Sequence, residues 1–191
     1  MLREYRTPTI FGLPLPVGAV PVDGENAAVA RFAAWVDALG SLSQASLATR
    51  ARLLEEVKMV ARHINAGTEL GMASGYGRRV LYENPGRWSL AAISLRPGQR
   101  TEMHDHASWG CAVTVQGIER DRRFVADASG NLVLSGERNY PRGTGYVFDT
   151  TDVHQPVGAD PRQVTVALHF LVHDPAHHNV KPEVVELAIA A

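Results

Sequence analysis

The sequence has little cysteine, no long apolar run and almost no net charge, and each absence excludes a class of protein. Cys111 is the only cysteine among 191 residues, so no disulfide can form within the chain. No apolar run approaches the roughly 18 residues that a membrane-spanning helix needs. A formal net charge of -1 gives no general field for nucleic acid or an anionic membrane. We therefore expect a small-molecule ligand, with neither nucleic acid nor membrane as a partner.

The N-terminal stretch MLREYRTPTIFGLPLPVG lacks the apolar core of a signal peptide. Together with the single cysteine, this favours a cytoplasmic location. The length fits one domain, and a hydrophobic content of 45% is ordinary for a globular protein. We expect a single domain over residues 1–191, as a monomer or homodimer.

The first third of the chain has the patterns of an arm and two helices. Residues 1–24 are rich in Pro and Gly and are expected to form an extended arm. Residues 25–67 carry apolar residues at the 3.6-residue spacing of helices. The second helix is expected to begin at Ser43 or Ser46 as the N-cap and to end at Gly67.

From residue 76 onward, short alternating or apolar runs are separated by turn signals. They predict seven or so strands: RRVLY, WSLAAISL, CAVTVQG, RRFVA, NLVLS, GYVF and QVTVALHFLV. With no helix between them, these strands favour a β-sandwich or closed barrel with the helical pair on its outside. We expect a mainly β fold with the barrel at residues 76–175 and a C-terminal tail at residues 176–191.

Two histidines one residue apart precede the strand CAVTV in the stretch TEMHDHASWGC. In an extended segment, His104 and His106 project to one face, so both imidazoles can reach one point. In a barrel, His154 could return to the same mouth from a later loop. Single histidines more often cap turns or hydrogen-bond in a core, but this set favours a metal site. Three imidazoles suit Zn, Fe, Ni or Cu better than Ca or Mg.

The spacing of glycines and histidines resembles the first motif of the cupins, whose fold is a double-stranded β-helix or jelly-roll barrel. The matching positions are Gly98, His104, His106, Gly110 and Gly117. In cupins, the Gly110 position usually holds a glutamate ligand, and that ligand is absent here. The second motif is looser, since its glycine and histidine fit but Pro and Gly are replaced by acidic and hydroxyl residues. The remaining three-histidine set resembles that of the thiol dioxygenases, relatives of cysteine dioxygenase.

The resemblance extends to Tyr76-Gly77-Arg78, which looks like a Tyr-x-Arg element of that family. It implies that Tyr76 and Arg78 hold the substrate carboxylate. A guanidinium can give a carboxylate two parallel charge-assisted hydrogen bonds, which agrees with this role. Without the neighbouring motif, Arg78 would be interpreted as a solvated charge on an edge strand.

Downstream, the family's Ser-x-His-x-Tyr relay falls on Ala167, His169 and Leu171, so only the histidine remains. His169 is either a catalytic group, as the resemblance implies, or a core histidine with a satisfied hydrogen bond. Without the relay tyrosine, the crosslink to cysteine found in animal cysteine dioxygenases should not form. Strand alternation turns Cys111 away from the face of Gly110, so we expect it to be a small buried hydrophobe.

The resemblance implies an Fe(II) enzyme that adds both atoms of O2 to the sulfur of a small carboxylate-bearing thiol and gives a sulfinate. Arg78 favours cysteine over 3-mercaptopropionate, whereas the missing tyrosine argues against a standard cysteine enzyme. Arg79, Arg100 or Arg142 could give a second carboxylate contact for a substrate such as mercaptosuccinate. We also expect Trp109 to wall the pocket.

A different class of function stays open, because cupin barrels also serve as binding modules. The alternative is a metal-binding cupin that acts as a small-molecule sensor or as an isomerase. Isomerases generally keep the acidic ligand that Gly110 lacks, which counts against that part of the alternative.

Overall fold

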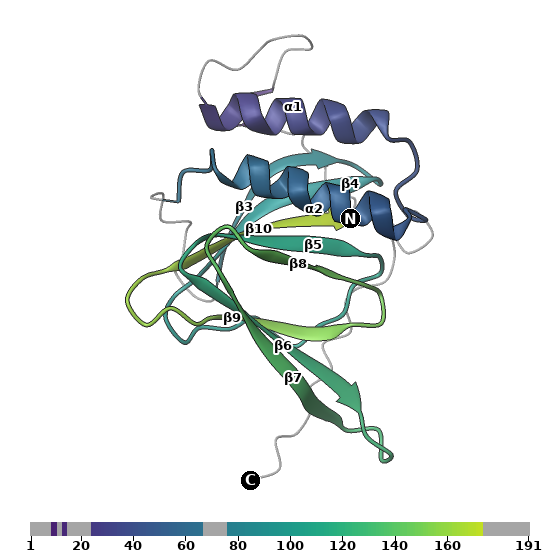
Figure 1. Cartoon of the computed structure of the whole chain (residues 1–191), viewed down its shortest axis with the longest axis vertical. Helices are drawn as coiled ribbons and strands as arrows, with labels where there is room; N and C mark the ends of the chain where they lie inside the picture. The colour runs from purple at the N-terminus through teal and green to yellow at the C-terminus, as the bar shows by residue number, and fades with distance from the viewer. Residues whose placement is uncertain (1–8, 11–12, 15–23, 67–75, 174–191) are drawn as a thin grey trace, which may run out of the picture.

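The computed structural model describes residues 9–10, 13–14, 24–66 and 76–173 (Figure 1). Its helices are α1 (Gly24–Ala38) and α2 (Leu47–Ala61), and its strands are β1 (Thr9–Ile10), β2 (Leu13–Pro14), β3 (Gly77–Asn84), β4 (Trp88–Leu95), β5 (Gly110–Gln116), β6 (Ile118–Ala126), β7 (Leu132–Pro141), β8 (Gly145–Phe148), β9 (Val153–Gly158) and β10 (Thr165–Val172). In the part of the chain that the structure describes, strands alone follow the helical pair, so the predicted mainly β fold is confirmed.

The helices begin close to the predicted positions. Helix α1 begins at Gly24, one residue before the predicted helical segment. Ser46, one of the two expected N-caps, accepts a hydrogen bond from the backbone N–H of Thr49 at 3.2 Å. Helix α2 ends at Ala61 with Arg62 as its C-cap, so the predicted end at Gly67 is wrong, since the described residues 62–66 are no longer helical. Neither α1 nor α2 has the length and apolar character that would let it cross a membrane.

The long strands form two antiparallel sheets. The five-stranded sheet has the order β3-β4-β10-β5-β8, and the three-stranded sheet has the order β7-β6-β9. Both helices lie along one side of the five-stranded sheet, and the hairpin of β6 and β7 projects away from them (Figure 1). The predicted packing of the helical pair on the outside of the barrel is confirmed.

The central strands are apolar on both faces because each face is covered. In β10, Leu168 and Phe170 pack into the main core beneath the helices, where Phe32 of α1 makes an edge-on contact with the ring of Phe170. The alternate residues His169 and Leu171 face the other way and line a pocket. Strand β4 divides in the same way, which explains why it is buried along its whole length.

The sequence analysis did not predict one of the strands. The segment VHQPVG forms β9, although Pro156 interrupts any alternating pattern. Strand β9 is the outer partner of β6, at the edge of the three-stranded sheet, which is where a proline is tolerated. The division into arm, helical segment, barrel and tail stays a prediction, and residues 176–191 lie outside the described part of the chain.

Candidate metal centre and substrate pocket

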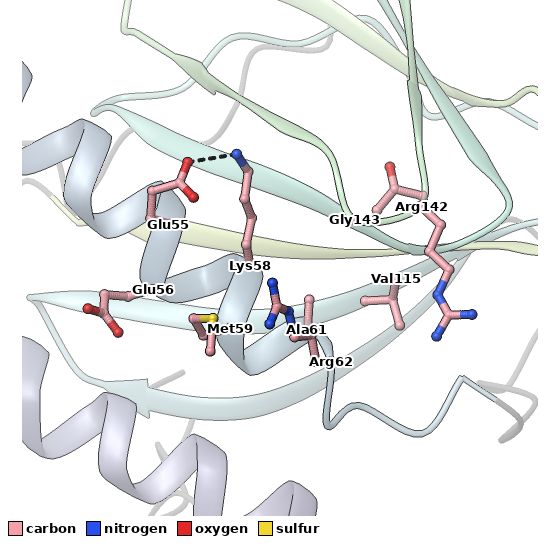
Figure 2. A pocket seen from close by; sticks show the side chains of 10 residues that line it. Glu55, Glu56, Lys58, Met59, Ala61, Arg62, Val115, Arg142 and Gly143 are labelled. Atoms are coloured by element: carbon pink, nitrogen blue, oxygen red, sulfur yellow. Dashed lines mark hydrogen bonds and ion pairs between the residues drawn. The ribbon is translucent and has the colours of Figure 1, made fainter.

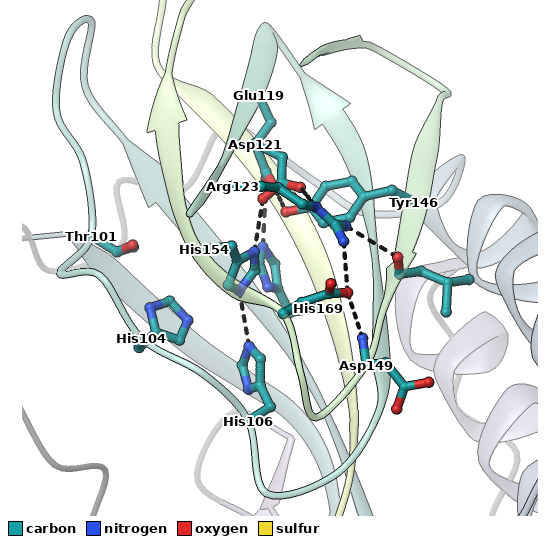
Figure 3. Close-up of polar contacts among 12 residues, drawn as sticks. Thr101, His104, His106, Glu119, Asp121, Arg123, Tyr146, Asp149, His154 and His169 are labelled. Carbon is teal, nitrogen blue, oxygen red and sulfur yellow. Dashed lines mark hydrogen bonds and ion pairs between the residues drawn. The ribbon is translucent and has the colours of Figure 1, made fainter. Parts of the chain in front are cut away.

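The three histidines of the predicted metal site come together in space. One ring nitrogen from each of His104, His106 and His154 lies within 4.8 Å of the other two (Figure 3). The backbone of His104 pairs with that of His154 through two hydrogen bonds, of 3.0 and 2.8 Å. This isolated β-bridge ties the loop before β5 to strand β9, so the cluster is held by main chain as well as by side chains.

A buried carboxylate fixes the orientation of His154. Asp121 of β6 lies 2.7 Å from Nδ1 of His154, and both residues are almost inaccessible to solvent. Burial by itself would raise the pKa of Asp121, but the contacts with His154 and Arg123 outweigh it and bring the pKa below its usual value. The carboxylate therefore accepts the Nδ1–H bond and leaves the Nε2 lone pair for a metal.

The other two rings are also prepared as neutral ligands. Nδ1 of His104 donates to the carbonyl oxygen of Glu102 at 2.8 Å, which leaves its Nε2 lone pair available. Burial, and then electrostatic repulsion from the neighbouring ring of His154, lower the pKa of His104 to about 4 and that of His106 to about 2. Both rings are therefore uncharged at neutral pH, which is the form that binds metal.

The nitrogen spacing fits a first-row transition metal. Nε2 of His106 lies 3.0 Å from Nε2 of His154. Two nitrogens that bind one ion at about 2.1 Å and at a right angle would be about 3.0 Å apart. Three imidazole ligands at this spacing suit iron, zinc, nickel or copper.

No acidic fourth ligand can be added at the predicted position, Gly110. A Cβ atom there would lie 2.5 Å from Cζ of Phe148 and 2.5 Å from the backbone oxygen of Phe170. The ring of Phe148 also stacks on His106 at a centroid distance of 4.4 Å. The packing around Gly110 therefore excludes a glutamate and is consistent with a set of three histidines.

A pocket of about 320 Å³ opens beside the cluster. The candidate residues Tyr76, Arg78, His104, His106 and His169 all contribute to its lining, whereas His154 is fully buried behind them. The apolar part of its wall comes mainly from Ala91, Ile93 and Leu171. The structure thus brings the six predicted site residues to one place.

Strand register explains why Arg78 faces the pocket and Arg79 does not. Arg78 lies opposite Ile93, which lines the pocket, so both share one face of the sheet. Arg79 belongs to the opposite face and forms an ion pair with Glu25 of α1 at 2.6 Å. Among the described residues, no carboxylate is paired with Arg78. Arg78 is therefore a cation available to a ligand.

None of the three arginines suggested for a second carboxylate contact lines the pocket. Arg79 is taken up by Glu25, as described above. Arg142 lies at a different surface pocket, which it shares with Lys58 of α2 and with Arg62, the residue that follows this helix (Figure 2). Arg100 is exposed and does not line the site pocket.

Trp109 does not wall the pocket either. It is buried in the core and donates from Nε1 to the carbonyl oxygen of Leu42 at 2.8 Å. Its position between the sheet and the helical layer explains why it packs away from the metal site. Cys111, by contrast, is buried in the same core on the face predicted for it.

The sequence analysis missed the polar groups that support the histidines. Glu119, Asp121 and Arg123 occupy alternate positions of β6, and the two carboxylates are buried. Arg123 donates from Nε to Asp121 at 2.7 Å and from a terminal nitrogen to Asp152 at 2.6 Å. The alternation of these three residues could have indicated a shared face of the strand. Arg120 and Arg122 on the other face are also charged, so the sequence alone did not show which face is buried.

A known protein family matches the whole of the described barrel and part of the helical region. The model of the family described as cysteine dioxygenase type I matches residues 53–180. No curated protein matches the chain.

Among solved structures, a cupin superfamily protein from Desulfitobacterium hafniense is 12% identical, with 60% of this chain and 87% of the other covered and a TM-score of 0.43. A protein from Thermus thermophilus is 15% identical, with 59% and 98% covered and a TM-score of 0.46. An oxalate decarboxylase from Lactobacillus farciminis is 17% identical, with 53% and 30% covered and a TM-score of 0.43. The family match spans more than half of the sequence, and the chain belongs to the cysteine dioxygenase type I family of cupins.

Proposed function

We propose that the protein is an Fe(II)-dependent thiol dioxygenase that converts a small carboxylate-bearing thiol, such as cysteine or a mercapto-acid, to its sulfinate. The observation that carries this proposal is the shared pocket, whose lining includes Arg78 together with His104 and His106 of the histidine cluster, with His154 buried directly behind them. A carboxylate at one end of the substrate and a thiolate at the other match these two sites.

His104, His106 and His154 are the proposed ligands of the iron. Their neutral rings would leave the full double positive charge on the ion, which favours a thiolate as an added ligand. When bound, the iron supplies the redox chemistry that joins both atoms of O2 to the substrate sulfur. Asp121 keeps the lone pair of His154 directed at the ion by accepting the Nδ1–H bond.

Arg78 and Tyr76 are the proposed carboxylate-binding groups. The guanidinium of Arg78 can donate two hydrogen bonds, and Tyr76 two residues earlier contributes to the same pocket. The apolar side chains of Ala91, Ile93 and Leu171 would pack against the carbon chain of the substrate and exclude water from it. Held in this way, the sulfur is positioned at the histidine cluster, which lowers the entropic cost of the reaction.

The test combines oxygen uptake with an arginine substitution. Iron-loaded protein should consume O2 with cysteine, 3-mercaptopropionate or mercaptosuccinate, and mass spectrometry should find the sulfinate product. Arg78→Gln should leave the iron content unchanged and raise KM for the thiol acid about tenfold or more, because a hydrogen bond to a charged group contributes roughly 1.5–3 kcal/mol. The exposed Arg100, outside the pocket lining, provides the matched control Arg100→Gln.

Cysteamine, a thiol without a carboxylate, separates a carboxylate contact from a general defect. Its KM should respond much less to Arg78→Gln than that of the thiol acids. Equal losses for both substrates would refute the role of Arg78. If the iron-loaded protein consumes no O2 with any small thiol, the dioxygenase proposal is wrong and a binding or sensor role replaces it.

A further inference from the structure

Behind the pocket, two buried polar atoms face each other, and neither forms a hydrogen bond with any residue that the structure describes. They are Oε2 of Glu119 on β6 and Nε2 of His169 on β10, which lie 3.5 Å apart. Glu119 is 1% exposed, so bulk water cannot supply the missing hydrogen bond to its carboxylate. Because buried polar groups are strongly favoured to pair, the contact available to each of these atoms is the other one.

Tyr146 of β8 fixes the second oxygen of Glu119. Its hydroxyl donates to Oε1 at 2.6 Å (Figure 3). Burial raises the pKa of Tyr146 well above its ordinary value, so the phenol stays protonated and remains a donor. With Oε1 engaged in this way, Oε2 is the oxygen directed at the imidazole of His169.

His169 receives no polar partner from its own strand. Ala167 and Leu171, two residues before and after it on the same face of β10, carry no hydrogen-bonding side chain. The ring nevertheless contributes to the lining of the pocket that holds Arg78 and the histidine cluster. His169 therefore lies between the pocket on one side and a buried carboxylate on the other.

We propose that Glu119, held by Tyr146, is a positioning residue that fixes the ring of His169 and keeps its proton on Nε2. This inference rests on the proposed function for its chemical use. The tautomer leaves Nδ1 of His169 able to accept a proton. When the substrate thiol is deprotonated, the S–H bond breaks, an N–H bond forms at Nδ1, and the sulfur keeps the electron pair as a thiolate. The carboxylate of Glu119 then stabilises the imidazolium beside it.

The tautomer can be measured without metal or substrate. Nitrogen-15 NMR of the metal-free full chain at about pH 8, where an ordinary imidazole is neutral, reports which ring nitrogen of His169 carries the proton, and His169→Gln assigns its signals. We expect a protonated Nε2 and an unprotonated Nδ1 in the wild type. A wild-type ring with its proton on Nδ1 would overturn the inference, whatever the activity of the protein.

Two variants separate the carboxylate from its surroundings. Tyr146→Phe keeps Glu119 and should retain the tautomer. The double variant Glu119→Leu, Tyr146→Phe replaces both polar partners by apolar groups of similar size, which is a replacement that buried sites tolerate. In the double variant, the signals of the two ring nitrogens should move toward each other as the tautomers mix.

The kinetic signature differs from that of a structural defect. In the iron-loaded double variant, we expect kcat to fall about tenfold or more, as for a misplaced acid–base group, with KM for the thiol acid within about twofold of wild type. The iron content should not change. A double variant that keeps a single tautomer, or that keeps its kcat, refutes the role of Glu119. Absence of turnover in the wild type would refute the proposed function and leave the NMR result to decide the inference.

Discussion

Replacing Asp121 by Asn should weaken metal binding about 10- to 100-fold, the usual effect of losing a group that orients a metal-binding histidine. The carboxylate is 2% exposed and accepts from Nδ1 of His154 at 2.7 Å. An asparagine of the same shape lacks the negative charge that stabilises this contact. A hydrogen bond to a charged group contributes about 1.5–3 kcal/mol, and losing this free energy corresponds to about the same 10- to 100-fold loss of metal affinity.

The surroundings of Asp121 limit the damage to this contact. Arg123 loses one charged partner but keeps its ion pair with Asp152 at 2.6 Å, so the end of β6 stays tied to the segment before β9. We therefore expect the fold to survive and the metal affinity to fall. Anaerobic titration of Fe(II) against a competing chelator measures the affinity, and the midpoint of urea unfolding checks the fold.

Glu137→Gln is the matched control for this experiment. Glu137 lies in the same sheet, forms ion pairs with Arg120 and Arg122, and is much more exposed than Asp121. It loses the same charge but has no contact with the histidines, so its metal affinity should stay within about threefold of wild type. A wild-type affinity in Asp121→Asn, or an equal loss in Glu137→Gln, would refute the assigned role of Asp121.

Three further predictions concern the histidines and the cysteine. His104→Ala, His106→Ala and His154→Ala should each lose most of their iron, and near-normal iron content in any variant would remove that residue from the ligand set. The metal-free protein should be less stable in acid, because folding lowers the pKa of His104 to about 4 and that of His106 to about 2. As the pH falls below about 6.5, these rings take up protons in the unfolded chain but not in the folded chain, which favours unfolding. Urea unfolding should show this loss between about pH 6.5 and about pH 4, at up to about 1.4 kcal/mol per pH unit for each ring, and an unchanged midpoint would contradict it. Burial raises the pKa of Cys111 to about 12, so iodoacetamide at about pH 8 should label this residue only in denaturant. The variant Cys111→Ala should turn over substrate as the wild type does. Rapid labelling of the folded protein, or a large loss of activity in the variant, would place the thiol at the pocket.

Two histidines of the candidate metal site could be predicted from the sequence because their spacing is local. His104 and His106 are separated by one residue, and an extended backbone places both rings on one face without help from the rest of the fold. The joining of His154 to them depended on the expected barrel, in which a later loop could return to the same mouth, since its strand, β9, contains Pro156 and has no alternating pattern. Arg78 was joined to the site by the resemblance, and its register opposite Ile93 explains why it lines the pocket.

The supporting groups could not be predicted because their burial is a property of the assembled sheets. Glu119 and Asp121 are charged residues in a strand with charges on both faces, and sequence alone does not say which face is covered. The predictions for Trp109 and Arg79 were wrong because both residues are near the predicted site in the sequence but contact the helical layer in the fold. Trp109 donates to the carbonyl oxygen of Leu42, and Arg79 pairs with the carboxylate of Glu25.

The close packing at Gly110 has a consequence for how this site can evolve or be engineered. An enlarged side chain there would meet both the ring of Phe148 and the main-chain oxygen of Phe170 on the neighbouring strand. Trimming Phe148 relieves only the first clash, and it also removes the ring that stacks on His106. A mutational path from three ligands to four must therefore respace β5 and β10 before the new carboxylate can be of use. The backbone spacing around Gly110 thus limits the number of protein ligands that this site can offer, and a single substitution at Gly110 should not create a four-ligand centre.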